Sequence, residues 1–236
     1  MKIIILFLMV LVTFLSKPLS AQNFLKVKYS INDIKKQREN FKNEKVKYLT
    51  VQNSYGSSIY EIDSQGKILS FRDKSKSEID AGFNYDLKGN LVSIDYRLAP
   101  DEYEYDGNGN VMKKFGEEST ENYFYDLQNK LVKEEVESES ESYATEKLVY
   151  DELLLIEKVY PCSMGNYAFR YVYEYLNSGK LHKVFQYSKN CSSGIEEIVD
   201  EEEYFYYEDS NLPYKMKSWR EGQNVSEINF EYEYYE

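Results

Sequence analysis

One short phrase recurs along the chain and constrains the fold more than any other feature. It reads as an aromatic residue, any residue, Tyr, Asp, two more residues, Gly, Asn or Lys, and an aliphatic residue. Residues 83–91 and 103–111 are full copies, and residues 123–131 form a third copy with Asn129 in place of the Gly. Repetition at a period of roughly 20 to 50 residues indicates one supersecondary unit that is duplicated and stacked. The chain is therefore expected to fold as an array of similar units.

Weaker copies extend the array toward the C-terminus. The copy at Asp151 lacks the Gly, while the copies at Leu176 and Tyr207 keep the frame but have lost the Asp. Successive spacings are 23, 20, 20, 25, 25, 31 and 26 residues, counted between the Asp positions at Asp63, Asp86, Asp106, Asp126, Asp151, Leu176, Tyr207 and Glu233.

Each position of the phrase has a role in a β-hairpin. Asp at the start of a type I turn accepts hydrogen bonds from the turn backbone, and Gly three residues later adopts the left-handed conformation that a following bulge requires. In this turn the Asp faces the Asn or Lys that follows the Gly, and the same register predicts Tyr103 opposite Lys113. The Tyr before the Asp should pair with the aliphatic residue on one face, as Tyr85 with Leu91, Tyr105 with Val111, Tyr125 with Leu131 and Tyr175 with Leu181.

Short polar connections between the copies predict an up-and-down antiparallel meander. The face opposite the tyrosines is also partly apolar, and a sheet that is apolar on both faces must curl, close or be covered. We therefore expect an all-β fold with a strongly curled or barrel-like sheet. Residues predicted on that opposite face are Val92, Ile94, Met112, Val132, Val136, Val172 and Val184.

The N-terminal part of the chain lies outside the array. Residues 1–21 have the short basic start, apolar run and small final residue, Ala21, of a secretory signal peptide. Residues 22–50 form an N-terminal segment, in which Ser30 to Asp33 resembles a capping box and predicts a short helix over about residues 31–42 that could cover an open end of the sheet. Residues 51–236 form the repeat domain. We expect an exported protein of the periplasm, cell surface or extracellular space, with no integral membrane segment after signal cleavage.

Charge excludes two classes of partner. The formal net charge is -12, with 29 basic and 41 acidic residues, and it becomes 27 minus 41, or -14, when the signal peptide with Lys2 and Lys17 is removed. Binding to nucleic acid or to an anionic membrane surface depends on clustered Lys and Arg. Neither is expected as a partner. The Glu- and Ser-rich stretch from Glu134 to Glu146 is interpreted as a solvated hairpin tip or two charged strand ends.

Cys162 and Cys191 are the two cysteines, and export favours a disulfide between them. The register of the hairpin whose turn spans Asn177 to Gly179 predicts them near its open end, with a three-residue offset that a loop or bulge can absorb. The bridge would close a loop of about 30 residues and contribute on the order of 3 kcal/mol. Two unpaired thiols are the alternative.

The sequence contains little that indicates reaction chemistry. His182 is the sole histidine and lacks ligands at metal-binding spacing, so a packed or solvated His is favoured over a ligand or base. Residues 106–110 resemble a calcium loop, but Val111 stands where that loop requires Gly, so a turn is favoured. A carboxylate dyad of a glycosidase is not indicated. We expect no catalytic residue, no cofactor and no metal.

At residues 59–233 the phrase resembles the tyrosine-aspartate (YD) repeat of the Rhs and wall-associated protein family. The resemblance implies β-hairpin arrays that form sheet shells, and in some members adhesion or carbohydrate binding at cell surfaces. The array here is short and no toxin-like domain follows it, so only the architecture and an exported interaction role are carried over.

Three functional hypotheses remain. The first is an exported, non-enzymatic binding or scaffolding protein that contacts protein or carbohydrate at the cell envelope through Tyr-rich sheet surface. Its candidate contact residues are Trp219, Tyr103, Tyr123, Tyr173 and Tyr204, although any single Tyr is better explained as core. The second is a small outer-membrane β-barrel-like protein, whose strands need a lipid-facing apolar stripe. The third, a hydrolase, has no residue in its favour.

Overall fold

The computed structural model describes residues 31–236 except residues 55, 97–98, 139–141, 146, 153, 165 and 221. The predicted signal peptide and Ser30 of the capping box lie outside the described residues. Helix α3 (Ile31–Asn43) matches the predicted helix, and the first strand, β1, begins within the N-terminal segment 22–50. Within the described residues, no helix is both long enough and apolar enough to cross a membrane.

The remaining elements are β-strands, most of them arms of the predicted hairpins. Their bounds are β1 (Val46–Asn53), β2 (Gly56–Ile62), β3 (Ile68–Asp73), β4 (Ala81–Tyr85), β5 (Leu91–Tyr96), β6 (Pro100–Tyr105), β7 (Val111–Phe115), β8 (Ser119–Tyr125), β9 (Leu131–Ser138), β10 (Ser142–Ala144), β11 (Lys147–Asp151), β12 (Leu154–Met164), β13 (Tyr167–Tyr175), β14 (Leu181–Asn190), β15 (Glu196–Tyr206), β16 (Pro213–Arg220) and β17 (Gln223–Tyr234).

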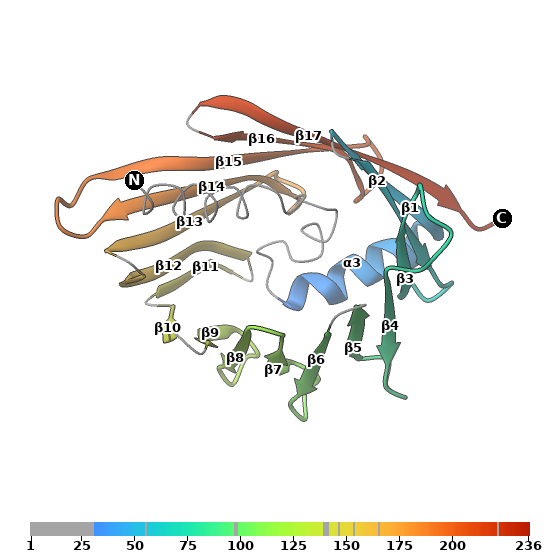
Figure 1. Ribbon diagram of the computed structural model, residues 1–236, viewed down its shortest axis with the longest axis horizontal. Coiled ribbons are helices and arrows are strands. Elements are labelled where there is room, and N and C mark those ends of the chain that lie inside the picture. Colours follow the sequence, from blue (N-terminus) through green and yellow to red (C-terminus); the bar gives the residue numbers. More distant parts are fainter. Residues whose placement is uncertain are drawn as a thin grey trace, which may run out of the picture.

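These strands form one antiparallel meander that curls into a nearly closed barrel (Figure 1). Each strand pairs with the next from β1 to β10 and again from β11 to β17. The ring closes because β17 returns to pair with the free edge of β1. Between β9 and β12 the strand is interrupted: its first part, β10, pairs with β9, and its second part, β11, pairs with β12. The Thr145 amide, directly after β10, donates to the Glu134 carbonyl of β9 over 2.8 Å. The prediction of an all-β, barrel-like sheet is confirmed.

The repeated phrase forms the predicted three-residue turns with a bulge. In the copy at Asp86, the Asp86 amide donates to the Asn90 carbonyl over 2.9 Å, and Gly89 has the left-handed φ of 84°. The Asp86 carboxylate accepts the Asn90 amide at 2.7 Å. Hydrogen bonds to the charged carboxylate, of which the bond from the Asn90 amide has the largest effect, lower the pKa of Asp86. The four predicted Tyr–aliphatic pairs are confirmed.

The predicted register beyond the first pair is wrong by one residue. Tyr103 lies opposite Lys114, not Lys113, because Met112 forms a bulge directly after the aliphatic Val111. One extra residue reverses which face each later side chain occupies. Ile94, Val136 and Val184, which were predicted on the opposite face, are therefore buried inside the barrel with the tyrosines. Among the other residues predicted there, the bulge residues Met112 and Val132 are exposed on the outside.

The Tyr before the turn also joins each hairpin to the hairpin before it. Its hydroxyl donates to the backbone carbonyl at the start of the previous hairpin's second strand, over 2.7–3.0 Å in six places. A seventh bond, from Tyr235 to the Ile62 carbonyl over 2.7 Å, links β2 to the residue after β17. We call these bonds the tyrosine links. They connect Tyr85 to Ile68, Tyr105 to Leu91, Tyr150 to Leu131, Tyr175 to Leu155, Tyr206 to Leu181 and Tyr232 to Pro213.

Helix α3 lies across the end of the barrel that carries the repeat turns (Figure 1). The Arg38 guanidinium donates to the Gln65 and Gly89 carbonyls, over 3.2 and 2.9 Å. The Lys36 ammonium donates to the Gly179 carbonyl over 3.3 Å, and Phe41 is buried in the main core. The helix thus contacts turns from three different hairpins, as expected of an element that covers the open end.

Cys162, near the end of β12, and Cys191, directly after β14, form the predicted disulfide. The two Cα atoms are 5.9 Å apart and the bridge spans 29 residues of sequence. It lies at the end of the barrel opposite the repeat turns, where it ties β12 to β14 across the start of β13.

Candidate functional site

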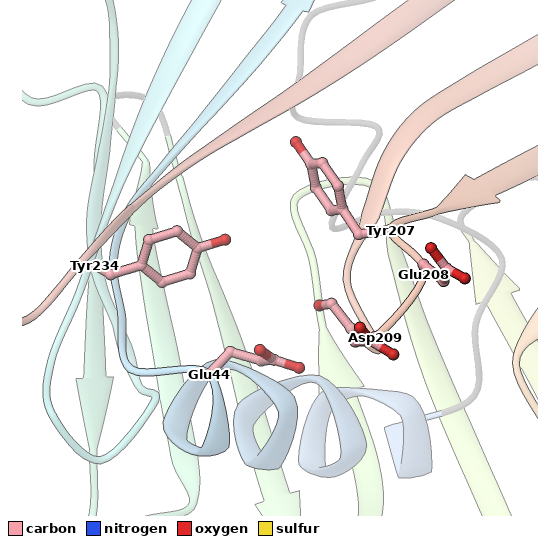
Figure 2. A pocket seen from close by; sticks show the side chains of 6 residues that line it. Glu44, Tyr207, Glu208, Asp209 and Tyr234 are labelled. Atoms are coloured by element: carbon pink, nitrogen blue, oxygen red, sulfur yellow. The ribbon is translucent and has the colours of Figure 1, made fainter.

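A hollow of about 420 Å³ opens at the turn end of the barrel (Figure 2). Three segments that are distant in sequence build it: the residue after α3, the loop between β15 and β16, and the end of β17. Its lining consists of Glu44, Tyr207, Glu208, Asp209, Ser210 and Tyr234.

The loop at Tyr207 departs from the other repeat turns because its sequence lacks the Asp and the Gly. Tyr206 pairs with Pro213, so residues 207–212 connect the two strands in place of the usual five. Leu212 turns inward and is buried, whereas Tyr207, Glu208 and Asp209 remain exposed. The Asn211 amide donates to the Glu44 carboxylate over 3.3 Å, which fixes this loop against the end of α3.

Two exposed aromatic rings flank the hollow. Tyr207 and Tyr234 are 45% and 51% exposed, and Figure 2 shows them on either side, with Glu44 and Asp209 below them in this view. The Tyr207 ring lies 5.2 Å from the ring of Tyr214, which extends the aromatic surface along β16. The tyrosines inside the barrel, by contrast, are covered.

The charge of the hollow is negative. Partial burial raises the pKa of Tyr234, and the neighbouring Tyr207 and Glu44 raise it further, so this hydroxyl stays neutral and can donate a hydrogen bond. Among the described residues, no Lys or Arg forms an ion pair with Glu44, Glu208 or Asp209. The Lys180 ammonium donates to the backbone carbonyl of Ser210 over 2.8 Å and is not paired with these carboxylates. The site therefore offers two aromatic faces, hydroxyl donors and carboxylate acceptors.

The binding residues predicted from the sequence lie elsewhere. Tyr103, Tyr123, Tyr173 and Tyr204 face the inside of the barrel, and the last two are only 6% and 4% exposed. Trp219 is half-buried on β16, opposite Asn224 at the far end of that strand. The structure therefore places the four tyrosines on the inner wall and separates them from Trp219, and none of the five lines the hollow.

The inner wall at β7 and β8 carries paired charges. Lys114 lies 2.8 Å from the Glu121 carboxylate, which also accepts a hydrogen bond from the Tyr123 hydroxyl. Burial alone would raise the pKa of Glu121, but Lys114 and Tyr123 outweigh it and the pKa is lowered. Burial and the same carboxylate raise the pKa of Tyr123 far above its usual value. These groups are a stable carboxylate and a neutral phenol, and neither is suited to exchange protons near neutral pH.

A second pair in this wall joins β9 to β12 across the interrupted strand formed by β10 and β11. The Glu134 carboxylate of β9 lies 2.6 Å from the Lys158 ammonium of β12 and accepts the Tyr160 hydroxyl over 2.9 Å. Glu134 is only 8% exposed, so the solvated-tip interpretation of the Glu-rich stretch fails at its first residue, whereas β9 and β10 fit the alternative of two charged strand ends. The bulge at Val132 turns this side chain inward, opposite Tyr123.

His182 also stands at a bulge and faces outward. Its Nε2 atom is 3.7 Å from the Glu203 carboxylate, and its side chain is 32% exposed. The described part of the chain contains no group of three or more His, Cys, Asp or Glu side chains that could hold a metal ion.

The repeated phrase does not predict the hollow. Its residues come from two of the three copies in which the Asp is replaced, at Tyr207 and Glu233, and from the end of the helix. The copy at Leu176 also lacks the Asp but keeps the Gly and forms the usual turn. Loss of both the Asp and the Gly, as at Tyr207, is therefore the signal that could have identified a different loop.

Comparison with known proteins shows likeness only at the level of fold. No protein-family model matches the chain, and no curated protein matches its sequence. Among solved structures, TcdB2-TccC3 without its hypervariable C-terminal region matches with a TM-score of 0.33 and 14% identity, over 72% of this chain and 9% of that one. The chain therefore spans less than a tenth of that structure.

Two porin-like proteins match over nearly their whole length. The one from Bacteroides vulgatus has a TM-score of 0.37 and 13% identity, and covers 80% of this chain and 98% of its own. The one from Bacteroides uniformis has a TM-score of 0.36 and 8% identity, with 80% and 97% coverage. At these TM-scores the likenesses carry no argument about function, which must be drawn from the geometry of this chain.

Proposed function

We propose that this chain is an exported, non-enzymatic binding protein of the cell envelope that holds a protein or carbohydrate ligand at the hollow on its turn end. The observation that carries the proposal is the pair of exposed rings, Tyr207 and Tyr234, on either side of a hollow lined by carboxylates. Exposed Tyr offers a large contact area at low entropic cost together with a hydroxyl that can hydrogen-bond.

The distribution of the other polar groups supports a binding role. Glu121 and Glu134 are each neutralised by a lysine at 2.8 and 2.6 Å, and the phenols beside them are held neutral. A general acid or base needs a group whose pKa lies near the working pH. The Cys162–Cys191 disulfide supports export, because such bonds persist in oxidising compartments.

The test is a binding assay with a matched control variant. The exported chain is screened on a glycan microarray and against fractionated envelope proteins, and each hit is quantified for the wild type and for Tyr207→Ala/Tyr234→Ala. Tyr167→Ala removes a Tyr of similar exposure, 44%, at the opposite end of the barrel and serves as control. Loss of binding in the double variant alone supports the proposal. Equal binding by all three proteins, or binding by none, contradicts it.

A small outer-membrane β-barrel-like protein is the second candidate, favoured by the nearly closed sheet. Lipid-facing strands need an apolar outer stripe. The outer face here carries cross-strand ion pairs instead, between Arg170 and Glu196 at 2.7 Å and between Lys183 and Glu201 at 2.9 Å. Fractionation separates the two candidates, because recovery only in detergent-solubilised outer membranes would favour the second over the first.

A further inference from the structure

We infer that the hollow binds the cationic head of a lysine or arginine side chain that a protein partner presents. This inference names a ligand class for the proposed binding function and rests on it. The aromatic rings carry the argument, and the surrounding carboxylates support it.

The chain shows how its own tyrosines bind cations. In three repeats the Lys that follows the turn places its ammonium over the ring of the next hairpin's Tyr. The distances to the ring centre are 5.1 Å for Lys67 over Tyr85, 5.6 Å for Lys130 over Tyr150 and 5.5 Å for Lys180 over Tyr206. A cation within about 6 Å of an aromatic ring is attracted by the negative face of the ring.

The rings at the hollow are not used in this way. Among the described residues, no Lys or Arg lies over Tyr207, Tyr214 or Tyr234, although each of these rings is more than a third exposed. In the part of the chain that the structure describes, Glu208 and Asp209 likewise have no ion-pair partner, whereas Glu157, Glu196, Glu201 and Glu227 each pair with a cation on another strand. A cation beside the hollow, Lys180, donates to the backbone carbonyl of Ser210 over 2.8 Å and lies over Tyr206. The rings of Tyr207 and Tyr234 and the carboxylates of Glu208 and Asp209 thus combine the two groups that attract an organic cation.

The shape and chemistry of the site favour a side chain over a metal ion. The hollow is open to solvent and aromatic rings flank it, and its residues are not among any group of three or more His, Cys, Asp or Glu side chains that could hold a metal ion in the described part of the chain. The aliphatic stem of Lys or Arg can pack along the rings while its charged head reaches the carboxylates below. The net charge of -12 would also attract a basic partner over a distance.

The experiment is isothermal titration calorimetry of the exported chain at low ionic strength. The probes are a capped peptide with three lysines, the same peptide with every lysine Nε-acetylated, and spermidine as a free amine. Acetylation removes the charge and little else, so we expect the acetylated peptide to bind at least about tenfold more weakly. If spermidine binds more weakly than the lysine peptide, the ligand is a lysine or arginine side chain of a protein. If the two bind equally, the site does not distinguish a protein side chain from a free amine, and the protein partner is overturned.

Variants separate the role of the rings from general effects. Tyr234→Phe keeps the ring and should retain affinity for the lysine peptide, whereas Tyr234→Leu should weaken binding roughly two- to tenfold. Tyr207→Leu/Tyr234→Leu should abolish measurable binding, and Tyr167→Leu should leave it unchanged. A thermal melt of each variant confirms that it is folded.

The outcomes distinguish this inference from the proposed function. Equal binding of both peptides, or binding of neither, overturns the inference. If glycans or envelope proteins still bind in a Tyr207- and Tyr234-dependent manner in that case, the proposed function stands without it. If nothing binds in either assay, both fail.

Discussion

At the scale of single residues, the Tyr before each turn has a role that explains the unusual composition. The chain contains 25 tyrosines, and a tyrosine link at successive hairpins requires a ring that lies inside the barrel and a hydroxyl that reaches a backbone carbonyl. Phe could supply the ring but not the hydrogen bond. The aromatic positions of the phrase are thus selected by a bond between repeats as much as by the hydrophobic core.

Tyr105→Phe should therefore lower the free energy of unfolding by about 1 kcal/mol. The substitution removes the 2.7 Å hydrogen bond to the Leu91 carbonyl and leaves that carbonyl without its partner. Urea denaturation followed by circular dichroism measures the difference. Tyr234→Phe, at an exposed position, is the control and should change stability by less than about 0.5 kcal/mol. If the two variants lose the same free energy of unfolding, the tyrosine link does not stabilise the fold.

At the scale of elements, the helix is held by close contact with the repeat turns. Gly66 and Gly179 have the same left-handed backbone, with φ of 77° and 74°. A Cβ atom at Gly66 would lie 2.1 Å from the Arg38 carbonyl oxygen of α3, whereas a Cβ atom at Gly179 would meet nothing within 4 Å. The turn at Gly66 therefore has two roles, as a hairpin turn and as a seat for the helix.

The two Gly→Ala substitutions form a matched pair. Gly179→Ala should cost about 1–2 kcal/mol through backbone strain alone. Gly66→Ala should cost more, because α3 must also move, and it should increase amide hydrogen exchange in the helix. Exchange measured by mass spectrometry checks this. Equal stability loss without a change in the helix would mean that α3 is not seated on this turn.

The elements also show which part of the fold can be predicted from the sequence. The pairing of Tyr105 with Val111 follows from the Asp and Gly of one turn, so it is local and was predicted correctly. The next pair, Tyr103 with Lys114, depends on a bulge at Met112 that recurs at the same position in other copies, and the side chains at that position share no type that would indicate it. The hollow could not be predicted because Glu44, Tyr207 and Tyr234 meet only after the ring has closed.

At the scale of the whole molecule, side chains on the inner wall join strands that are not adjacent in the sheet. The Glu134–Lys158 ion pair and the Tyr160 hydroxyl link β9 to β12 across the interrupted strand formed by β10 and β11. Buried ion pairs contribute little net stability, but loss of one partner leaves an unpaired charge.

Glu134→Leu should consequently destabilise the barrel by about 3 kcal/mol, and Glu134→Leu/Lys158→Met should recover much of that loss. A double-mutant cycle by urea denaturation measures the coupling. The Glu121 and Lys114 pair, which joins the adjacent strands β8 and β7, provides the matched comparison for hydrogen exchange of β10 and β11. Additive effects of the two substitutions would exclude the ion pair as a stabilising link between β9 and β12.

The buried tyrosines also predict how the barrel responds to alkali. Burial raises the pKa of Tyr96 and of Tyr105 to about 12, above the usual value near 10. Because the folded state favours the neutral phenol, this contribution to stability is complete below pH 10 and is lost as pH rises toward 12. Circular dichroism and phenolate absorbance should change together over this range. Ionisation of all 25 tyrosines near pH 10 with the fold intact would contradict the prediction.

The pairing of β1 with β17 has a consequence for how the chain is made. During translation β1 emerges long before the strand that covers its second edge, so that edge stays exposed while the intervening hairpins are synthesised. Unpaired edges recruit other strands. Ring closure is therefore expected as a late event in folding, and under the proposed export it would take place on the far side of the membrane.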